Sequence, residues 1–154
     1  PVAEEYDLCG QLAECAVNYE PVWEKKDIGF DADMEDSVKI TADAALMELV
    51  WNNLFSNAVK FTEPGGTIKL TEQSDDSEIR VSVEDNGCGF SPEMLASFPV
   101  KEDNGHVGLS NLYHTLQLIY GPAASLHISN AEPNGARVTI FLPEEENHAH
   151  PSRG

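Results

Sequence analysis

The segment that most constrains the fold is residues 48–62, ELVWNNLFSNAVKFT, which contains no proline or glycine. Helix is the default prediction for such a segment. At about 100° per residue, one broad side of this helix is apolar. Its members are Met47, Trp51, Leu54, Phe55, Ala58 and Val59. The segment is therefore predicted to be a long helix packed against a hydrophobic core.

A narrow polar stripe on the same helix carries Asn53, Asn57 and Lys60, at spacings i, i+4 and i+7. Further upstream the stripe becomes apolar, which is unusual for a merely solvated face; the residues there are Leu46, Leu49 and Val50. Two interpretations stay open from this segment alone. The stripe is either a polar patch on a surface helix or the floor of a pocket. In the pocket, asparagine oxygens suit a hard cation such as Mg²⁺, and lysine suits phosphate.

Composition limits the classes of partner. The chain has 154 residues and a formal charge of −18, from 9 Lys+Arg against 27 Asp+Glu. This charge argues against general binding of nucleic acid or anionic membranes, so any bound phosphate needs a local site. The three cysteines show no zinc spacing and are odd in number, which favours a reducing cytoplasm. No apolar run approaches membrane-spanning length. The abrupt start at Pro1 suggests a piece of a longer protein.

The remaining pattern predicts an α+β fold. We expect a helix over residues 4–24, interrupted at Pro21, and two short strands around the acidic turn 31–37. Thr41 or Asp43 is expected to cap the central helix, which ends before the turn at 63–66. After this turn we expect a hairpin (67–71 and 79–83), a short helix from 91, a long helix (108–120) and two strands (125–129 and 137–142). The predicted architecture is a two-layer sandwich, a mixed sheet covered on one face by three helices. Residues 1–143 form one domain, and 144–154 are predicted to be a disordered tail.

Two glycine-containing segments add chemistry. Asp85-Asn86-Gly87-Cys88-Gly89 directly follows a predicted strand. Taken alone, this segment is more often a simple turn, but it also places one carboxylate beside backbone that a flat ligand can approach. Such a carboxylate can accept from an exocyclic amine. Residues 104–108, NGHVG, precede the last long helix. They form either an ordinary junction or a seat for phosphate at the helix N-terminus.

Taken in order, these three segments resemble a known family. NLFSNAVKFT is similar to the N box of the ATP-binding domain of sensor histidine kinases, DNGCGF to the first glycine box and NGHVGLSN to the second. These kinases belong to the GHKL superfamily, which includes gyrase, the ninety-kilodalton chaperone and the mismatch-repair ATPases and has the Bergerat fold. A weaker similarity extends over nearly the whole chain.

The resemblance implies roles for particular residues. Asn53, Asn57 and Lys60 would be catalytic, with Asn53 and Asn57 binding Mg²⁺ and the triphosphate and Lys60 on phosphate. Asp85 would accept a hydrogen bond from the adenine amino group. The full set expected to contact ATP is Asn53, Asn57, Lys60, Phe61, Asp85, Gly87, Gly89, Phe90, Gly105, Val107, Gly108, Leu109 and Thr139.

Three positions depart from the family pattern. Asn53 stands where the hydrolytic members have glutamate, and an amide cannot act as a general base; Glu48 is expected to point away from the stripe. The pattern is thus similar to that of phosphotransfer enzymes. His106 replaces a usual glycine in the second glycine box, and the lid before it (98–105) is short. Ala136 stands where the family often has threonine.

The function that the resemblance implies is that of the ATP-binding catalytic domain of a two-component sensor histidine kinase. It would bind Mg-ATP and present the γ-phosphate to a histidine on a separate dimerisation domain, with a response regulator as the next partner. None of the five histidines here has the phosphoacceptor context. The expected location is the cytoplasm, in a full-length protein that can be membrane-anchored. The alternatives are a serine kinase of the anti-sigma type and a degenerate interaction module.

Overall fold

The computed structural model describes residues 2–98 and 107–144. Its main feature is a five-stranded sheet in the order β2-β4-β5-β7-β6. The strands are β2 (Gly29–Asp33), β4 (Thr67–Ser74), β5 (Glu78–Asp85), β6 (Ser125–Asn130) and β7 (Ala136–Pro143). β2 runs parallel to β4, and the other neighbours are antiparallel, so the sheet is mixed as predicted.

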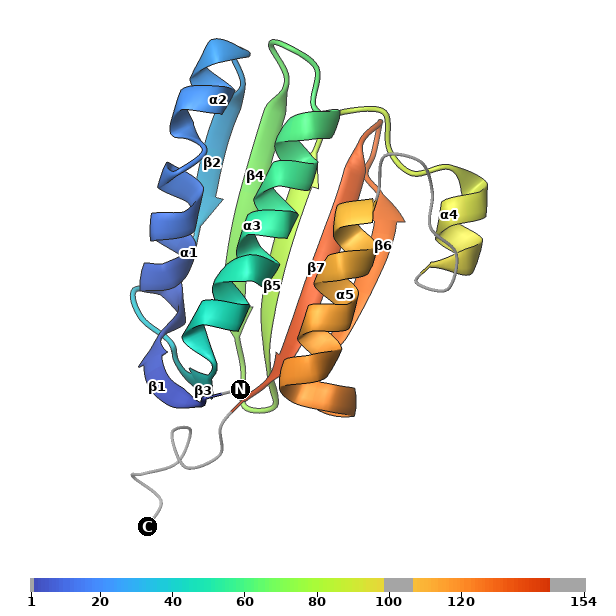
Figure 1. Ribbon diagram of the computed structural model, residues 1–154. Coiled ribbons are helices and arrows are strands. Elements are labelled where there is room, and N and C mark those ends of the chain that lie inside the picture. Colours follow the sequence, from blue (N-terminus) through green and yellow to red (C-terminus); the bar gives the residue numbers. More distant parts are fainter. Residues whose placement is uncertain (1, 99–106, 145–154) are drawn as a thin grey trace.

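Helices cover one face of this sheet (Figure 1). The three longer ones are α1 (Leu8–Val17), α3 (Ala44–Phe61) and α5 (Val107–Tyr120). α2 (Glu20–Lys25) continues the line of α1, whereas α4 (Pro92–Ser97) lies to the side, beyond β6; η1 (Gly121–Ala123) is a single turn after α5. The predicted α+β two-layer architecture is confirmed.

The central helix α3 explains most of the packing. All six residues of its predicted apolar side are buried, and Trp51 and Met47 are completely covered. The indole Nε1 of Trp51 still finds a partner, because it donates to Gln11 Oε1 at 2.9 Å. Asp43 caps the helix by accepting from the backbone N–H of Leu46, so one of the two predicted caps is confirmed.

The sheet presents its apolar residues to these helices by strict alternation. On β5, Ile79, Val81 and Val83 face the helical layer and are buried. Asp85 is the next residue in the same alternation and is also buried. The strand thus delivers a carboxylate to the inner face of the sheet, at the edge of the core.

The N-terminal prediction was wrong for residues 4–7. Residues Glu4–Asp7 form a strand, β1, which pairs with β3 (Lys39–Ala42) in a separate two-stranded sheet. Asp7 then caps α1 by accepting from the N–H groups of Cys9 and Gly10, so the helix begins only at Leu8. The helical region is broken before Pro21, which lies in the first turn of α2, where a missing N–H costs nothing.

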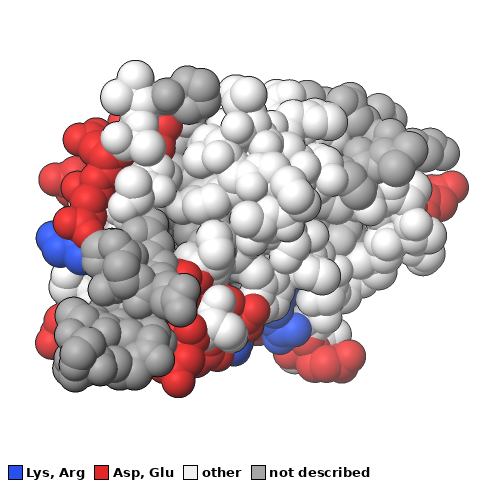
Figure 2. Space-filling view, turned by 90° about the horizontal axis from the view of Figure 1, so that it is seen from below, with Lys and Arg blue, Asp and Glu red and all other residues white. Residues whose placement is uncertain are grey.

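The two short strands around the acidic turn exist, but they do not pair with each other. β2 joins the main sheet beside β4, and β3 joins β1. Acidic side chains line the side of the molecule on which β2 and α1 lie (Figure 2), and few cations accompany them. No helix within the described ranges is long and apolar enough to cross a membrane.

Candidate functional site

Asp85 is the best-defined polar group of the predicted site. It is 5% exposed, and its Oδ1 accepts from the backbone N–H of Gly87 at 2.8 Å and of Ala136 at 3.3 Å. No donor reaches its other oxygen, Oδ2, from the described residues. Burial raises the pKa of this carboxyl above its ordinary value, and the two N–H groups only partly offset that effect. The side chain is therefore held in one orientation, with one acceptor oxygen left for a ligand.

The glycines of the turn after β5 are required by packing. A Cβ on Gly87 would overlap the carbonyl oxygen of Phe61, the last residue of α3. A Cβ on Gly135 would overlap the carbonyl oxygen of Asp85, and Gly135 also has a φ of +117°. The turn, the end of α3 and the start of β7 thus meet backbone to backbone around Asp85.

Asn130, which the sequence did not single out, fixes the next residue of this turn. Its Oδ1 accepts from the N–H of Phe90 at 2.7 Å, and its Nδ2 donates to the carbonyl of Phe90 at 3.1 Å. The Phe90 ring is buried in the core, so this residue anchors the turn through its side chain and its backbone together. Nothing in the local sequence distinguishes Asn130, because its partner lies 40 residues away.

Asn57 is the buried member of the α3 stripe. It is 8% exposed, and its amide forms no hydrogen bond with the described residues. Asn53, one turn earlier, is half-buried. A buried amide without a partner is costly in an ordinary core. The buried side-chain amide of Asn57 is thus available to hydrogen-bond or coordinate a ligand.

Lys60 and Phe61 lie at the edge of that stripe. The Nζ of Lys60 lies 5.3 Å from the centre of the Phe61 ring. Lys60 is exposed and lines a hollow between α2 and α3, together with Tyr19, Val22 and Ser56. Lys60 therefore lies on the side of α3 that faces α2, with its ammonium near the Phe61 ring.

The second glycine box is only partly described. Gly105 and His106, like most of the predicted lid, lie outside the described residues, as does the side chain of Val107. The side chain of Leu109 is fully buried in the core, which leaves only its backbone for a ligand. A Cβ on Gly108 would meet nothing within 4 Å, so packing against the described residues does not require glycine there.

Thr139 does not join this cluster. Val138 and Ile140 point into the core, and Thr139 between them lies on the opposite face of the sheet from Asp85. There its hydroxyl lies 3.3 Å from that of Ser82. The structure therefore corrects the prediction that Thr139 contacts the nucleotide. The alternation of apolar residues along this strand already indicated that Thr139 faces away from the helices.

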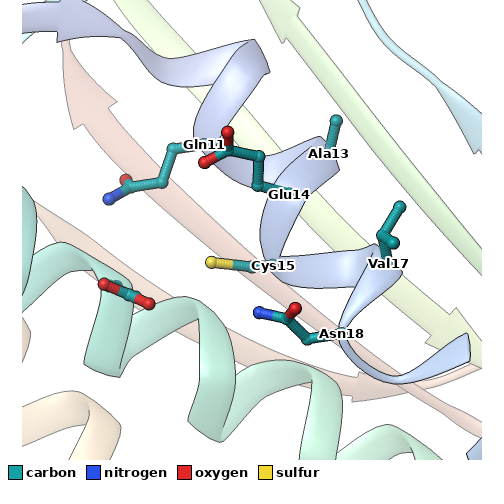
Figure 3. A pocket seen from close by; sticks show the side chains of 7 residues that line it. Gln11, Ala13, Glu14, Cys15, Val17 and Asn18 are labelled. Atoms are coloured by element: carbon teal, nitrogen blue, oxygen red, sulfur yellow. The ribbon is translucent and has the colours of Figure 1, made fainter.

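A separate hollow of about 480 Å³ lies between α1 and α3 (Figure 3). Gln11, Glu14 and Asn18 line it from α1 and the residue after it, with the buried Cys15 at its base. Glu48 of α3 completes the lining. This position confirms the expectation that Glu48 points away from the stripe of Asn53, and none of the predicted ATP-binding residues lines the hollow.

Comparison with known proteins then assigns the family. The family described as histidine kinase-, DNA gyrase B-, and HSP90-like ATPase matches residues 42–146, about two thirds of the chain. The chain belongs to this ATPase family. The matched region begins just before the cap of α3 and includes Asn57, Asp85 and both glycine boxes. The family is that of an ATP-binding domain, as the sequence motifs predicted.

Curated relatives are much longer than this chain. The sensor histidine kinase YpdA of Escherichia coli is 24% identical over 114 residues, which are 73% of this chain and 20% of the relative. The adaptive-response sensory kinase SasA of Prochlorococcus marinus is 38% identical over 89 residues, 56% of this chain and 24% of the relative. The chain thus spans about a fifth to a quarter of the length of these two relatives.

Solved structures confirm the fold. The catalytic domain of histidine kinase ThkA superposes with a TM-score of 0.83 at 24% identity, covering 94% of this chain and 98% of that one. A structure of ThkA in complex with the response regulator protein TrrA gives a TM-score of 0.78 at 24% identity. It covers 94% of this chain and 42% of that one. The arrangement of helices and sheet in Figure 1 is that of a histidine kinase catalytic domain.

Proposed function

We propose that this chain is the ATP-binding catalytic domain of a sensor histidine kinase and that it presents the γ-phosphate of Mg-ATP to a histidine outside it. The observation that carries this proposal is Asp85: a buried carboxylate with one oxygen held by two backbone N–H groups and the other left for a donor. The adenine amino group is such a donor. The family match supports ATP as the nucleotide.

The residues of α3 fit a magnesium-bound triphosphate. Asn57 offers an amide oxygen that no described residue uses, and Asn53 lies one turn away on the same stripe. Amide oxygens are suitable ligands for Mg²⁺, which would neutralise charge on the transferred phosphoryl group. Lys60 would add a positive charge near the phosphates. The contribution of this chain would thus be positioning and charge neutralisation.

The residue type at position 53 of α3 favours phosphoryl transfer over hydrolysis. Asn53 cannot remove a proton from water, so the site favours transfer to an acceptor over hydrolysis. The relatives named as sensor kinases are longer proteins, and a ThkA structure contains a response regulator. By analogy we propose that a dimerisation domain supplies the acceptor histidine and that a response regulator receives the phosphoryl group. A cytoplasmic location is proposed on the same basis.

Calorimetric titration tests the proposal. Wild-type protein should bind ATP, with higher affinity when Mg²⁺ is present. Asn57→Ala should weaken Mg-ATP binding at least tenfold but leave the melting temperature nearly unchanged, since Asn57 has no partner to lose. Asn52→Ala, on the same helix but off the stripe, is the matched control and should change neither quantity.

Three outcomes would contradict it. Absence of ATP binding by the wild-type chain would favour the interaction module. Equal affinity in wild type and Asn57→Ala would remove α3 from the site. Turnover of ATP by the isolated chain at about 1 s⁻¹ or more would indicate a dedicated hydrolase.

A further inference from the structure

Glu72 is an ionisable residue on the buried face of the sheet, where side chains are normally apolar. It lies on β4, on the same inner face as Ile68 and Leu70, and it pairs with Val81 of β5. Only 1% of Glu72 is exposed. Glutamate is rarely buried to this degree unless it is paired. The site is four residues along β4 from Ile68, which pairs with Asp85, so it belongs to the other end of the sheet.

The carboxyl of Glu72 joins three elements. Its Oε1 accepts from the backbone N–H of Glu35, in the connection between β2 and β3, at 2.9 Å. The same oxygen accepts from the thiol of Cys9, in the first turn of α1, at 3.4 Å. The second oxygen, Oε2, is buried and has no hydrogen-bond partner among the described residues. One atom thus holds β4, α1 and the β2–β3 connection together.

The charged group that acts most on this carboxyl is acidic, although one cation, Lys39 of β3, lines a hollow together with Glu35 and Ser74. Glu35 approaches from the β2–β3 connection, where both its carboxylate oxygens accept from the hydroxyl of Ser74, at 2.7 and 2.9 Å. Cys9 approaches from α1, whose cap Asp7 adds a further negative charge near the thiol. The ion pairs of Arg80 with Asp75 and Glu78, and of Arg137 with Glu84, do not include Glu72.

The neutral form of Glu72 is accordingly favoured. Burial, and next the Glu35 carboxyl, raise its pKa to about 7, although the thiol of Cys9 and the N–H of Glu35 act in the opposite direction. Burial and the neighbouring Glu72 raise the pKa of the Cys9 thiol to about 12. The thiol therefore keeps its proton and remains a donor throughout the physiological range.

We propose that Glu72 is a proton-operated clasp: its neutral carboxyl stabilises the junction of β4, α1 and the β2–β3 connection, and loss of the proton weakens it. The unfolded chain ionises this group at its ordinary pKa, near 4.5, whereas the folded chain keeps the proton until about pH 7. Its contribution to stability is thus complete below the unfolded value and is lost as pH rises through the folded value. The ratio of folded to unfolded protein should fall on the order of a hundredfold over this interval. The proposal does not depend on ATP binding.

Two measurements on the chain test the clasp. A ¹³C NMR titration should show the side-chain carboxyl of Glu72 titrating near pH 7. Glu35→Gln should lower this midpoint, because it removes a neighbouring negative charge, and Cys9→Ala should raise it, because it removes a donor. Urea unfolding at pH 6 and pH 8 should show wild type losing stability at the higher pH.

Glu72→Gln keeps the shape of the side chain and removes its charge. The stability of this variant should therefore show only the pH dependence that comes from the other titratable groups of the chain. Glu24→Gln, on the exposed surface of α2, is the control and should behave as wild type. A Glu72 midpoint below pH 5.5 would overturn the proposal, and so would an equal pH dependence in wild type and Glu72→Gln. If Glu72→Gln does not fold, the NMR midpoints of wild type, Glu35→Gln and Cys9→Ala decide the question by themselves.

Discussion

Asp85→Asn should change which nucleotide base the site accepts. The two backbone donors at Gly87 and Ala136 both point at Oδ1, 2.8 and 3.3 Å away. The asparagine oxygen must take this position to satisfy them, so the new NH₂ group takes the place of Oδ2. A donor then faces the adenine amino group, which is also a donor.

The magnitude follows from the interaction that is lost. A hydrogen bond to a charged acceptor contributes about 1.5–3 kcal/mol, so ATP affinity should fall about 10- to 150-fold. Guanine presents a carbonyl oxygen where adenine has its amine, and the asparagine can donate to it. The preference for ATP over GTP should therefore shrink by more than the loss in ATP affinity alone. Stability should not fall, because burial already disfavours the Asp85 carboxylate.

Calorimetric titration with ATP and with GTP, together with the melting temperature, checks each part. Asp75→Asn is the matched control: Asp75 also accepts from two backbone N–H groups, those of Ser77 and Glu78, but it lies in the exposed β4–β5 turn. This control should bind both nucleotides as wild type does. Equal ATP affinity in wild type and Asp85→Asn would refute the reasoning. A large drop in melting temperature would show that Asp85 serves mainly the fold.

Two further substitutions test the backbone around Asp85. Gly87→Ala forces its Cβ against the Phe61 carbonyl, so it should cost about 1–3 kcal/mol of unfolding free energy and weaken ATP binding; an unchanged urea midpoint would contradict the packing argument. Asn130→Ala removes both hydrogen bonds to the Phe90 backbone, so urea unfolding should show a loss of about 1–3 kcal/mol in stability. Asn111→Ala, at an exposed position of α5, is the control. A stability equal to that of the control would show that the Asn130 hydrogen bonds contribute little.

The local sequence determined the central helix and the hairpin. The apolar period of residues 47–59 and the cap at Asp43 are signals carried within one or two turns, and the structure follows both. The alternation along β4 and β5 likewise predicted two paired strands. The three motifs indicated the family, because their chemistry depends on residue type and spacing along the chain. These predictions needed no knowledge of distant partners.

The tertiary structure alone decided what depends on a distant partner. Residues 4–7 were included in the predicted N-terminal helix, but they form a strand because β3 supplies the hydrogen bonds and Asp7 ends the extended segment. β2 pairs with β4 across the whole of α3, which no local pattern reveals. The same reason applies at the site: Asn130 reaches Phe90 from 40 residues away, and the need for glycine at position 87 comes from the end of α3. Helical periodicity and capping depend on interactions between residues close together in the sequence. Strand pairing and backbone contacts depend instead on which distant segments the core brings together.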